Sequence, residues 1–130
     1  MKTIEVVAGV IKDKQGLTLA VQRGESSKEY ISKKWEFPGG KIEAGESREE
    51  ALSRELSEEL KIETTIGDLV MTVDHTYPDF RLIMHAFHCE ILSGELTLTE
   101  HLDQKWLRGS ELKDLDWAAA DVPIVDKLIL

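Results

Sequence analysis

Hydrophobic and polar positions alternate along much of this chain, and valine, isoleucine and threonine are frequent in the alternating stretches. Such alternation is typical of strands that bury one face. We expect strands at residues 4–11, 17–22, 35–37, 62–74, 80–91 and 104–107. The turn signal between the first two predicts that they pair as a β-hairpin. The glycine pair at residues 39–40 is expected to break the chain sharply.

Two other stretches have the spacing of apolar residues that an amphipathic helix requires. Leucines at every fourth position from Leu52 to Leu60 predict the first helix. Ser47 is a suitable N-cap, and Glu50 three residues later completes a capping-box pattern. A second helix is expected over residues 121–129, where a proline follows the first two residues and apolar residues come after it.

The proportions of the chain fit one folded domain over residues 1–130. The sequence has 130 residues, of which 42% are hydrophobic and 32% are charged, as is ordinary for a globular protein. The predicted strands outnumber the helices, and no repeat of fixed period occurs. We therefore expect an α+β fold in which a mixed β-sheet lies between helices.

Charge and cysteine content narrow the range of functions. A formal charge of -9, without a basic face in the order of residues, disfavours binding of a nucleic-acid polymer. An anionic ligand would need local positive charge from Lys, Arg or a divalent metal. Cys89 is the sole cysteine, which excludes an internal disulfide, and its apolar neighbours favour a core role. The first residues are too quickly interrupted by charge for a signal peptide or membrane span, so a cytoplasmic protein without membrane contact is expected.

The segment GGKIEAGESREEALSRELSEEL concentrates glutamate in and before the first predicted helix. Glu55, Glu58 and Glu59 fall within about 100° of one another on that helix, beside the leucine stripe. Two such charges about 4 Å apart repel by about 1 kcal/mol in water and about 4 kcal/mol at an effective dielectric of 20. A divalent cation would reverse the sign of this energy, and carboxylates are the ligands that Mg²⁺ and Mn²⁺ select. A solvated acidic face is the alternative, but these three lie in the C-terminal half, where the helix dipole disfavours them.

The two glycines before the helix indicate what such a metal would serve. Glycine lets the backbone approach a ligand closely and can expose a carbonyl or an amide. Mg²⁺ commonly binds through a few carboxylates together with substrate phosphates. The segment therefore predicts an acidic site that binds a polyphosphate through a metal.

This segment resembles the Nudix box, whose pattern is G-x5-E-x7-R-E-U-x-E-E-x-G-U, with U a bulky aliphatic residue. The residues that match, with the spacing intact, are Gly40, Glu46, Arg54, Glu55, Leu56, Glu58, Glu59 and Ile62. One position departs, because Lys61 stands where the family has a glycine that ends the helix in a left-handed conformation. A lysine there costs about 1 kcal/mol or forces a different ending. The departure concerns the helix terminus and leaves the predicted ligands unchanged.

Outside the box the chain is similar to the MutT-like branch from end to end. Residues 35–41 resemble that branch's entry to the box, and residues 100–106 resemble its glutamate-containing loop and strand. Residues 84–88 and 120–124 are most similar to the bacterial CTP pyrophosphohydrolase subgroup. The resemblance implies a Nudix fold, an α/β/α sandwich around a mixed sheet. It also implies hydrolysis of a nucleoside triphosphate to the monophosphate and pyrophosphate.

The resemblance further implies roles for the acidic residues. Glu55, Glu58 and Glu59, with the carbonyl of Gly39, would bind Mg²⁺, with Mn²⁺ possible in its place. The metal would activate water and neutralise phosphate charge, which makes Glu58 catalytic as well as a ligand. Arg54 would orient the neighbouring carboxylates, a surface ion pair being the alternative.

Other residues are candidates for proton transfer and for nucleotide recognition. Glu100 matches the loop glutamate of the branch, as a general base or a further ligand. Arg23 corresponds to an arginine that contacts substrate, while Phe37 and Tyr77 would flank the base unless they are core residues. Asp121 could accept from an exocyclic amino group such as that of cytosine, or cap the last helix. The four histidines lack ligand spacing and are expected to be structural or on the surface.

The leading hypothesis is a Mg²⁺-dependent pyrophosphohydrolase acting on CTP, dCTP or a nucleotide with a modified base. The alternative within this class is an 8-oxo-dGTP diphosphatase that sanitises the nucleotide pool. A non-catalytic Nudix module that binds a nucleotide and a purely structural acidic helix are ranked below these. The expected partner is a small-molecule triphosphate, and both a monomer and a homodimer stay open.

Overall fold

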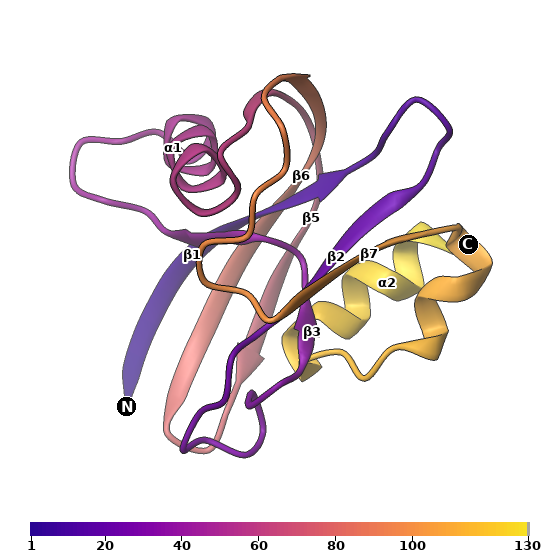
Figure 1. Cartoon of the computed structure of the whole chain (residues 1–130). Coiled ribbons are helices and arrows are strands. Elements are labelled where there is room, and N and C mark those ends of the chain that lie inside the picture. Colours follow the sequence, from indigo (N-terminus) through magenta and orange to yellow (C-terminus); the bar gives the residue numbers. More distant parts are fainter. Residues whose placement is uncertain (130) are drawn as a thin grey trace.

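Two helices lie on opposite sides of a pair of β-sheets in the computed structural model, which describes residues 1–129 (Figure 1). Helix α1 (Arg48–Leu60) covers one side, and the C-terminal helix α2 (Val122–Leu128) covers the other. Two short 3-10 helices that the apolar spacing did not predict, η1 (Gly109–Asp114) and η2 (Ala119–Asp121), precede α2. No helix in the described part of the chain is long and apolar enough to cross a bilayer. The layers confirm the predicted α+β class and α/β/α sandwich.

The larger sheet has four strands in the order β4-β1-β6-β5. These strands are β1 (Lys2–Ile11), β4 (Gly39–Lys41), β5 (Glu63–Thr76) and β6 (Phe80–Ser93). β1 and β6 run parallel along the whole length of β1, while β4 and β5 pair antiparallel with their neighbours. The predicted mixed sheet is therefore present.

The second sheet corrects the predicted hairpin. Its three strands are β2 (Thr18–Gln22), β3 (Trp35–Glu36) and β7 (Asp103–Leu107), in the antiparallel order β3-β2-β7. The predicted hairpin between residues 4–11 and 17–22 is wrong, because β1 and β2 belong to different sheets; an isolated bridge joins Lys12, just after β1, to Thr18. β1 pairs instead with β6, a partner distant in sequence that the local alternation could not reveal.

A hydrophobic cluster lies on each side of β1, because its residues alternate between the two faces. Val7 and Ile11 belong to the cluster under α1, and Ala8 and Val10 to the cluster under α2. Cys89 lies in the first of these clusters, where burial raises its pKa to about 12. A thiol with this pKa stays protonated at neutral pH, so the predicted core role is confirmed.

Helix α1 begins and ends at residues that the sequence indicated. The Glu50 backbone N–H donates to the Ser47 hydroxyl at 3.0 Å, and the Ser47 N–H donates to the Glu50 carboxylate at 2.9 Å, which confirms the capping box. At the other end, Lys61 has a φ of 59°, the left-handed conformation that the family's glycine would adopt. The lysine thus preserves the helix ending and carries a backbone strain of about 1 kcal/mol.

The glycine pair forms strand β4 and not the sharp break that the sequence suggested. Gly39 lies opposite Ala8 and Gly40 opposite Val7 in the sheet. A Cβ on Gly39 would collide with the Val7 carbonyl oxygen, so a side chain would push β4 away from β1. The glycine is required by close strand packing, which brings β4 beside α1.

Candidate active site

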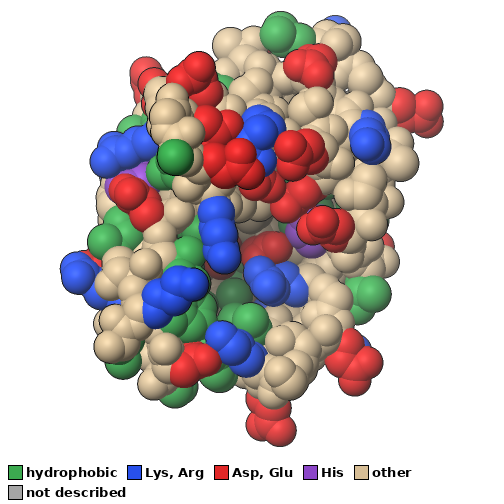
Figure 2. All heavy atoms as spheres, turned by 90° about the vertical axis from the view of Figure 1, so that its left-hand side faces the viewer, with side chains coloured by type: hydrophobic (Ala, Val, Ile, Leu, Met, Phe, Trp, Pro, Cys, Tyr) green, Lys and Arg blue, Asp and Glu red, His purple; other side chains and the backbone are tan. Residues whose placement is uncertain are grey.

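A pocket of about 620 Å³ opens between β4, the C-terminal half of α1 and the loops that follow β2 and precede β7. Figure 2 shows acidic side chains gathered above this hollow, with hydrophobic and basic side chains around its lower part. Most of the predicted site residues line it, namely Arg23, Phe37, Gly39, Glu59, Tyr77, Glu100 and Asp121. The remaining three, Arg54, Glu55 and Glu58, lie on α1 beside the acidic end. The fold therefore gathers residues from six separate parts of the sequence.

Glu59 is the carboxylate that projects from α1 into the pocket. Its Oε2 atom is buried and has no hydrogen-bond partner among the described residues. Burial, and then the negative charges of Glu55, Glu100 and Glu36, raise the pKa of Glu59 to about 8. A carboxyl group in this state lacks a positive partner, which a bound cation would supply.

Arg54 holds together the carboxylates around it. Its Nε donates to Glu46 Oε2 at 2.6 Å, and its Nη1 donates to Glu55 at 3.0 Å and to Glu58 at 3.4 Å. Its Nη2 reaches the Lys41 carbonyl of β4 at 3.0 Å. The hydrogen bond from Arg54 lowers the pKa of Glu46, and the same contact raises the pKa of Arg54. Arg54 is thus in contact with the carboxylates that the sequence predicted it would orient.

Gly40 gives Glu55 its place beside β4. A Cβ at Gly40 would overlap the Glu55 carboxylate, so only glycine leaves room for that side chain. The Glu55 side chain is 14% exposed, whereas that of Glu58 is 60% exposed. The two predicted ligands therefore differ in setting, one wedged between helix and strand and the other at the solvent edge.

The chemistry of these groups fits a divalent cation. Within residues 1–129, no three His, Cys, Asp or Glu side chains are already arranged to hold an ion. The unpaired buried oxygen of Glu59 and the close carboxylate of Glu55 are oxygen donors of the kind that Mg²⁺ takes. The residues present fit the metal, and the predicted ligand set of Glu55, Glu58, Glu59 and Gly39 stays a prediction.

Asp121 lies at the opposite end of the pocket, where α2 begins. The side chain is buried, and its Oδ1 accepts a hydrogen bond from the Phe37 N–H at 3.0 Å. The alternative that this carboxylate caps α2 is wrong, because η2 runs directly into α2 and the side chain makes no capping hydrogen bond. Burial, and then the charge of Glu36, hold the pKa of Asp121 well above its usual range. Its protonated form is therefore favoured.

Phe37 and Tyr77 form part of the pocket wall as core residues. Phe37 stacks on Trp117 with ring centroids 4.7 Å apart, and Tyr77 stacks on Tyr30 with centroids 5.1 Å apart. The Tyr77 hydroxyl accepts a hydrogen bond from the Ala120 N–H at 3.0 Å. Both rings are buried and already packed, which favours the core role that the sequence left open. Stacking on a base stays a prediction.

Two polar residues of the pocket were missed from the sequence. Glu36 accepts hydrogen bonds from Arg23 at 3.1 Å and from His101 at 3.1 Å. The imidazole of His101 is only 5% exposed and lines the pocket, so the expectation of a structural or surface histidine misses its position in the site. The signal that could have found Glu36 is its place in a strand between two buried aromatic residues, which turns it to the other face.

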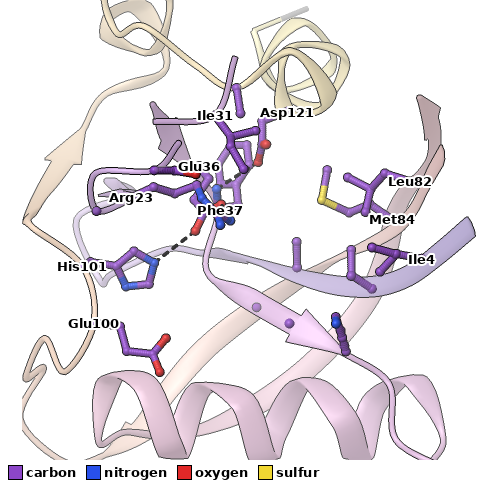
Figure 3. Close-up of a pocket in the computed structure, with 18 of the residues that line it drawn as sticks. Ile4, Arg23, Ile31, Glu36, Phe37, Leu82, Met84, Glu100, His101 and Asp121 are labelled. Atoms are coloured by element: carbon purple, nitrogen blue, oxygen red, sulfur yellow. Dashed lines mark hydrogen bonds and ion pairs between the residues drawn. The ribbon is translucent and has the colours of Figure 1, made fainter. Parts of the chain in front are cut away.

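The apolar side of the pocket was also missed. Figure 3 shows Ile4 of β1 and Leu82 and Met84 of β6 facing the cavity below Asp121. These residues belong to alternating strand runs, which indicate burial but do not distinguish a cavity wall from a packed core. The cavity thus has a polar end beside α1 and an apolar side next to the buried carboxyl group.

Comparison with known proteins identifies the family to which this three-layer fold with acidic side chains beside a glycine strand belongs. The NUDIX domain family matches residues 7–127. The CTP pyrophosphohydrolase of Escherichia coli (strain K12) is 38% identical over 126 residues, covering 97% of this chain and 91% of that protein. The 8-oxo-dGTP diphosphatase of the same organism is 30% identical over 128 residues, covering 98% of each. The crystal structure of the MutT protein from Methanosarcina mazei Go1 has a TM-score of 0.86 at 25% identity, covering 98% of this chain and 93% of that chain.

The chain therefore belongs to the Nudix family and is a Nudix hydrolase. This confirms the resemblance drawn from the box and from the flanking segments. The two Escherichia coli relatives are named for nucleoside triphosphates, CTP and 8-oxo-dGTP.

Proposed function

We propose that the chain hydrolyses CTP, dCTP or a related cytosine nucleotide to the monophosphate and pyrophosphate, with Mg²⁺ as the metal. The observation that carries the proposal is a single pocket with glutamates at one end and a buried Asp121 at the other. Its volume of about 620 Å³ suits a nucleotide, since small-molecule pockets span about 300–1,000 Å³. A cytoplasmic location and a monomeric or dimeric state stay predictions.

The acidic end would receive the phosphates. Glu55, Glu58 and Glu59, with the Gly39 carbonyl, are the groups that would hold Mg²⁺, which supplies charge neutralisation and an activated water when bound. Arg54 keeps the Glu55 and Glu58 carboxylates oriented through its hydrogen bonds. With the pKa of Glu59 raised to about 8, a cation and a proton compete for this carboxylate.

Glu100 is the proposed general base, with a role as a further ligand as the alternative. Its carboxylate lies at the pocket edge, where its charge raises the pKa of Glu59 across the site. A carboxylate at this place can take a proton from the attacking water. Glu100 would accept that proton while the phosphate chain is held at the α1 side.

Asp121, next to the apolar side of the pocket, is the residue that favours cytosine as the bound base. A protonated carboxyl group offers one O–H donor and one acceptor oxygen, and the raised pKa of Asp121 favours this form. The hydrogen-bonding edge of cytosine offers the N4 amino donor beside the N3 acceptor, which is the complementary pair. Arg23, ion-paired with Glu36 at the mouth of the pocket, is the proposed further contact to the nucleotide.

An oxidised purine nucleotide is the second candidate, because a relative at 30% identity is named 8-oxo-dGTP diphosphatase. The corresponding edge of a guanine base presents two donors, N1–H and the N2 amino group. An ionised Asp121 would match two donors better than a protonated one. The two candidate substrates thus differ in the protonation state of Asp121 that they require.

Initial rates of pyrophosphate release distinguish the candidates. The substrates are CTP, dCTP, 5-methyl-dCTP, dGTP and 8-oxo-dGTP, each with saturating Mg²⁺. The highest kcat/KM on a cytosine nucleotide supports the proposal, and the highest value on 8-oxo-dGTP would replace it with the second candidate. Absence of turnover with every substrate would overturn both.

A further inference from the structure

We propose that His101 is a positioning residue of the hydrolytic site. Its hydrogen bond to Glu36 fixes the neighbouring Glu100 at the acidic end of the pocket. The inference rests on the proposed function, because it gives Glu100 its role in hydrolysis. It adds His101 and Glu36 to the machinery as residues that act through another side chain.

The His101 imidazole is held in one orientation. Its side chain is 5% exposed, and Nε2 lies 3.1 Å from Oε2 of Glu36 on β3. A carboxylate only accepts hydrogen bonds, so Nε2 must carry the hydrogen. Figure 3 shows the imidazole turned toward Glu36, while the Glu100 side chain extends toward α1. The two adjacent side chains thus serve different ends of the pocket.

Hydrogen bonds hold the backbone on both sides of residues 100–101. The Thr99 N–H and hydroxyl both donate to the Glu59 carbonyl, at 3.2 Å and 2.9 Å. The Leu102 N–H donates to the Gln22 carbonyl at 2.9 Å. Residues 100–101 lie between these two anchors, and the contact to Glu36 is the side-chain bond that fixes them. Without the His101–Glu36 hydrogen bond, the Glu100 side chain, which is the proposed general base, could change its direction.

Glu36 connects His101 to Arg23, the proposed contact to the nucleotide. Its Oε1 accepts from Arg23 and its Oε2 from His101, so each oxygen has one partner. The side chain of Glu36 is 18% exposed, which strengthens both bonds relative to a surface pair. Loss of the histidine donor would leave Oε2 unpaired and let residues 100–101 move between their two backbone anchors.

The test compares two amide side chains of different reach. In His101→Asn the amide nitrogen lies near the position of Nδ1 and cannot reach Glu36. In His101→Gln the amide nitrogen reaches the level of Nε2 and restores a donor. We expect H101N to lower kcat for CTP with Mg²⁺ by about 10- to 100-fold, as loss of a supporting partner typically does, with KM changed less than threefold. H101Q should recover most of the loss.

A double-mutant cycle separates positioning from a general structural effect. In the Glu100→Gln background, H101N should lower kcat by less than twofold, because the residue that it positions has lost its function. His88→Asn is the matched control, since His88 lies on β6 and lines a different cavity, and it should keep the wild-type kcat. Melting temperatures of all variants report whether each is folded.

Wild-type kcat in H101N would overturn the proposal, and so would losses from H101N and E100Q that multiply. Should H101N not fold, Glu36→Ala removes the same hydrogen bond from the other partner and takes its place in the cycle, with Arg23→Ala measured beside it because Glu36 also accepts from Arg23. If the wild-type chain hydrolyses no triphosphate, the proposed function itself fails. If it hydrolyses CTP while H101N is unimpaired, only the positioning role fails.

Discussion

Identical side chains in this protein have different chemistry because their neighbours differ. The pKa of Glu46 is lowered by Arg54, whereas the pKa of Glu59 is raised by burial and by surrounding glutamates. The spacing of the glutamates in the sequence located the acidic end of the pocket. It could not reveal Glu36 and His101, since they meet across 65 positions of the chain and each looks ordinary in its own segment.

Glu58→Gln should lower kcat by at least about 100-fold, because it removes a proposed metal-binding charge and keeps the side-chain volume. Initial rates with CTP and Mg²⁺ measure the effect. Glu49→Gln is the matched control on the same helix, as Glu49 lies in the first turn and outside the site. Equal rates for E58Q and E49Q would contradict the assignment of Glu58.

Asp121 predicts a pH dependence of stability. Its pKa is raised in the folded chain, so the folded state binds this proton more tightly than the unfolded state does. The resulting stabilisation is complete below the ordinary value of 3.8 and is lost as the pH rises toward the raised pKa. Asparagine does not titrate. We therefore expect the melting temperature of the wild type to fall relative to Asp121→Asn as the pH is raised, and parallel curves would contradict this.

Local sequence patterns predicted where the helices and strands lie better than which strands pair with one another. Helix α1 and both of its termini followed from leucine spacing, the capping box and the family's glycine position. The strands other than β4 were also found, but the hairpin was wrong because the parallel pairing of β1 with β6 depends on the whole fold. The sequence marked the two glycines of β4 as important, but it did not show why glycine is needed there. The reason is close packing against β1 and Glu55. Strand pairing over long separations is set by tertiary contacts, which no short window contains.

Lys61→Gly should stabilise the protein by about 1 kcal/mol, because glycine adopts the left-handed conformation without the clash that a Cβ causes. Urea denaturation measures the free energy of unfolding. Lys14→Gly is the matched control, since the backbone at Lys14 is outside the positive-φ region. There the same exchange adds only freedom to the unfolded chain and should not stabilise. A loss of stability in K61G would show that the lysine side chain stabilises the helix end.

The molecule as a whole carries a formal charge of -9, and much of the acidity of the pocket face gathers beside α1. The three-layer architecture was predictable because helices and strands of these lengths have few ways to share a core. The apolar side of the pocket was not predictable, since Ile4, Leu82 and Met84 come together through the pairing of β1 with β6, which are distant in sequence. The resemblance to a family supplied the link between the acidic helix and hydrolysis, which composition alone did not contain.

Mg²⁺ should raise the melting temperature of the folded protein, because the proposed site brings the carboxylates together only in the folded state. At 100 times its dissociation constant, a ligand of this kind stabilises by about 2.7 kcal/mol. Thermal unfolding with Mg²⁺ and with EDTA measures the shift. E58Q should lose most of the shift and E49Q should keep it. An equal shift in both variants would place the ion elsewhere.

The separation between the apolar side of the pocket and the helix that carries the glutamates has a practical consequence. Leu82 and Met84 contact the cluster under α2, while the carboxylates belong to the helix on the opposite layer. Under the proposed function, substitutions at Ile4, Leu82 and Met84 would change which base is accommodated and leave the glutamates of α1 in place. A small library at these three positions is therefore the place to look for variants that accept nucleotides with altered bases.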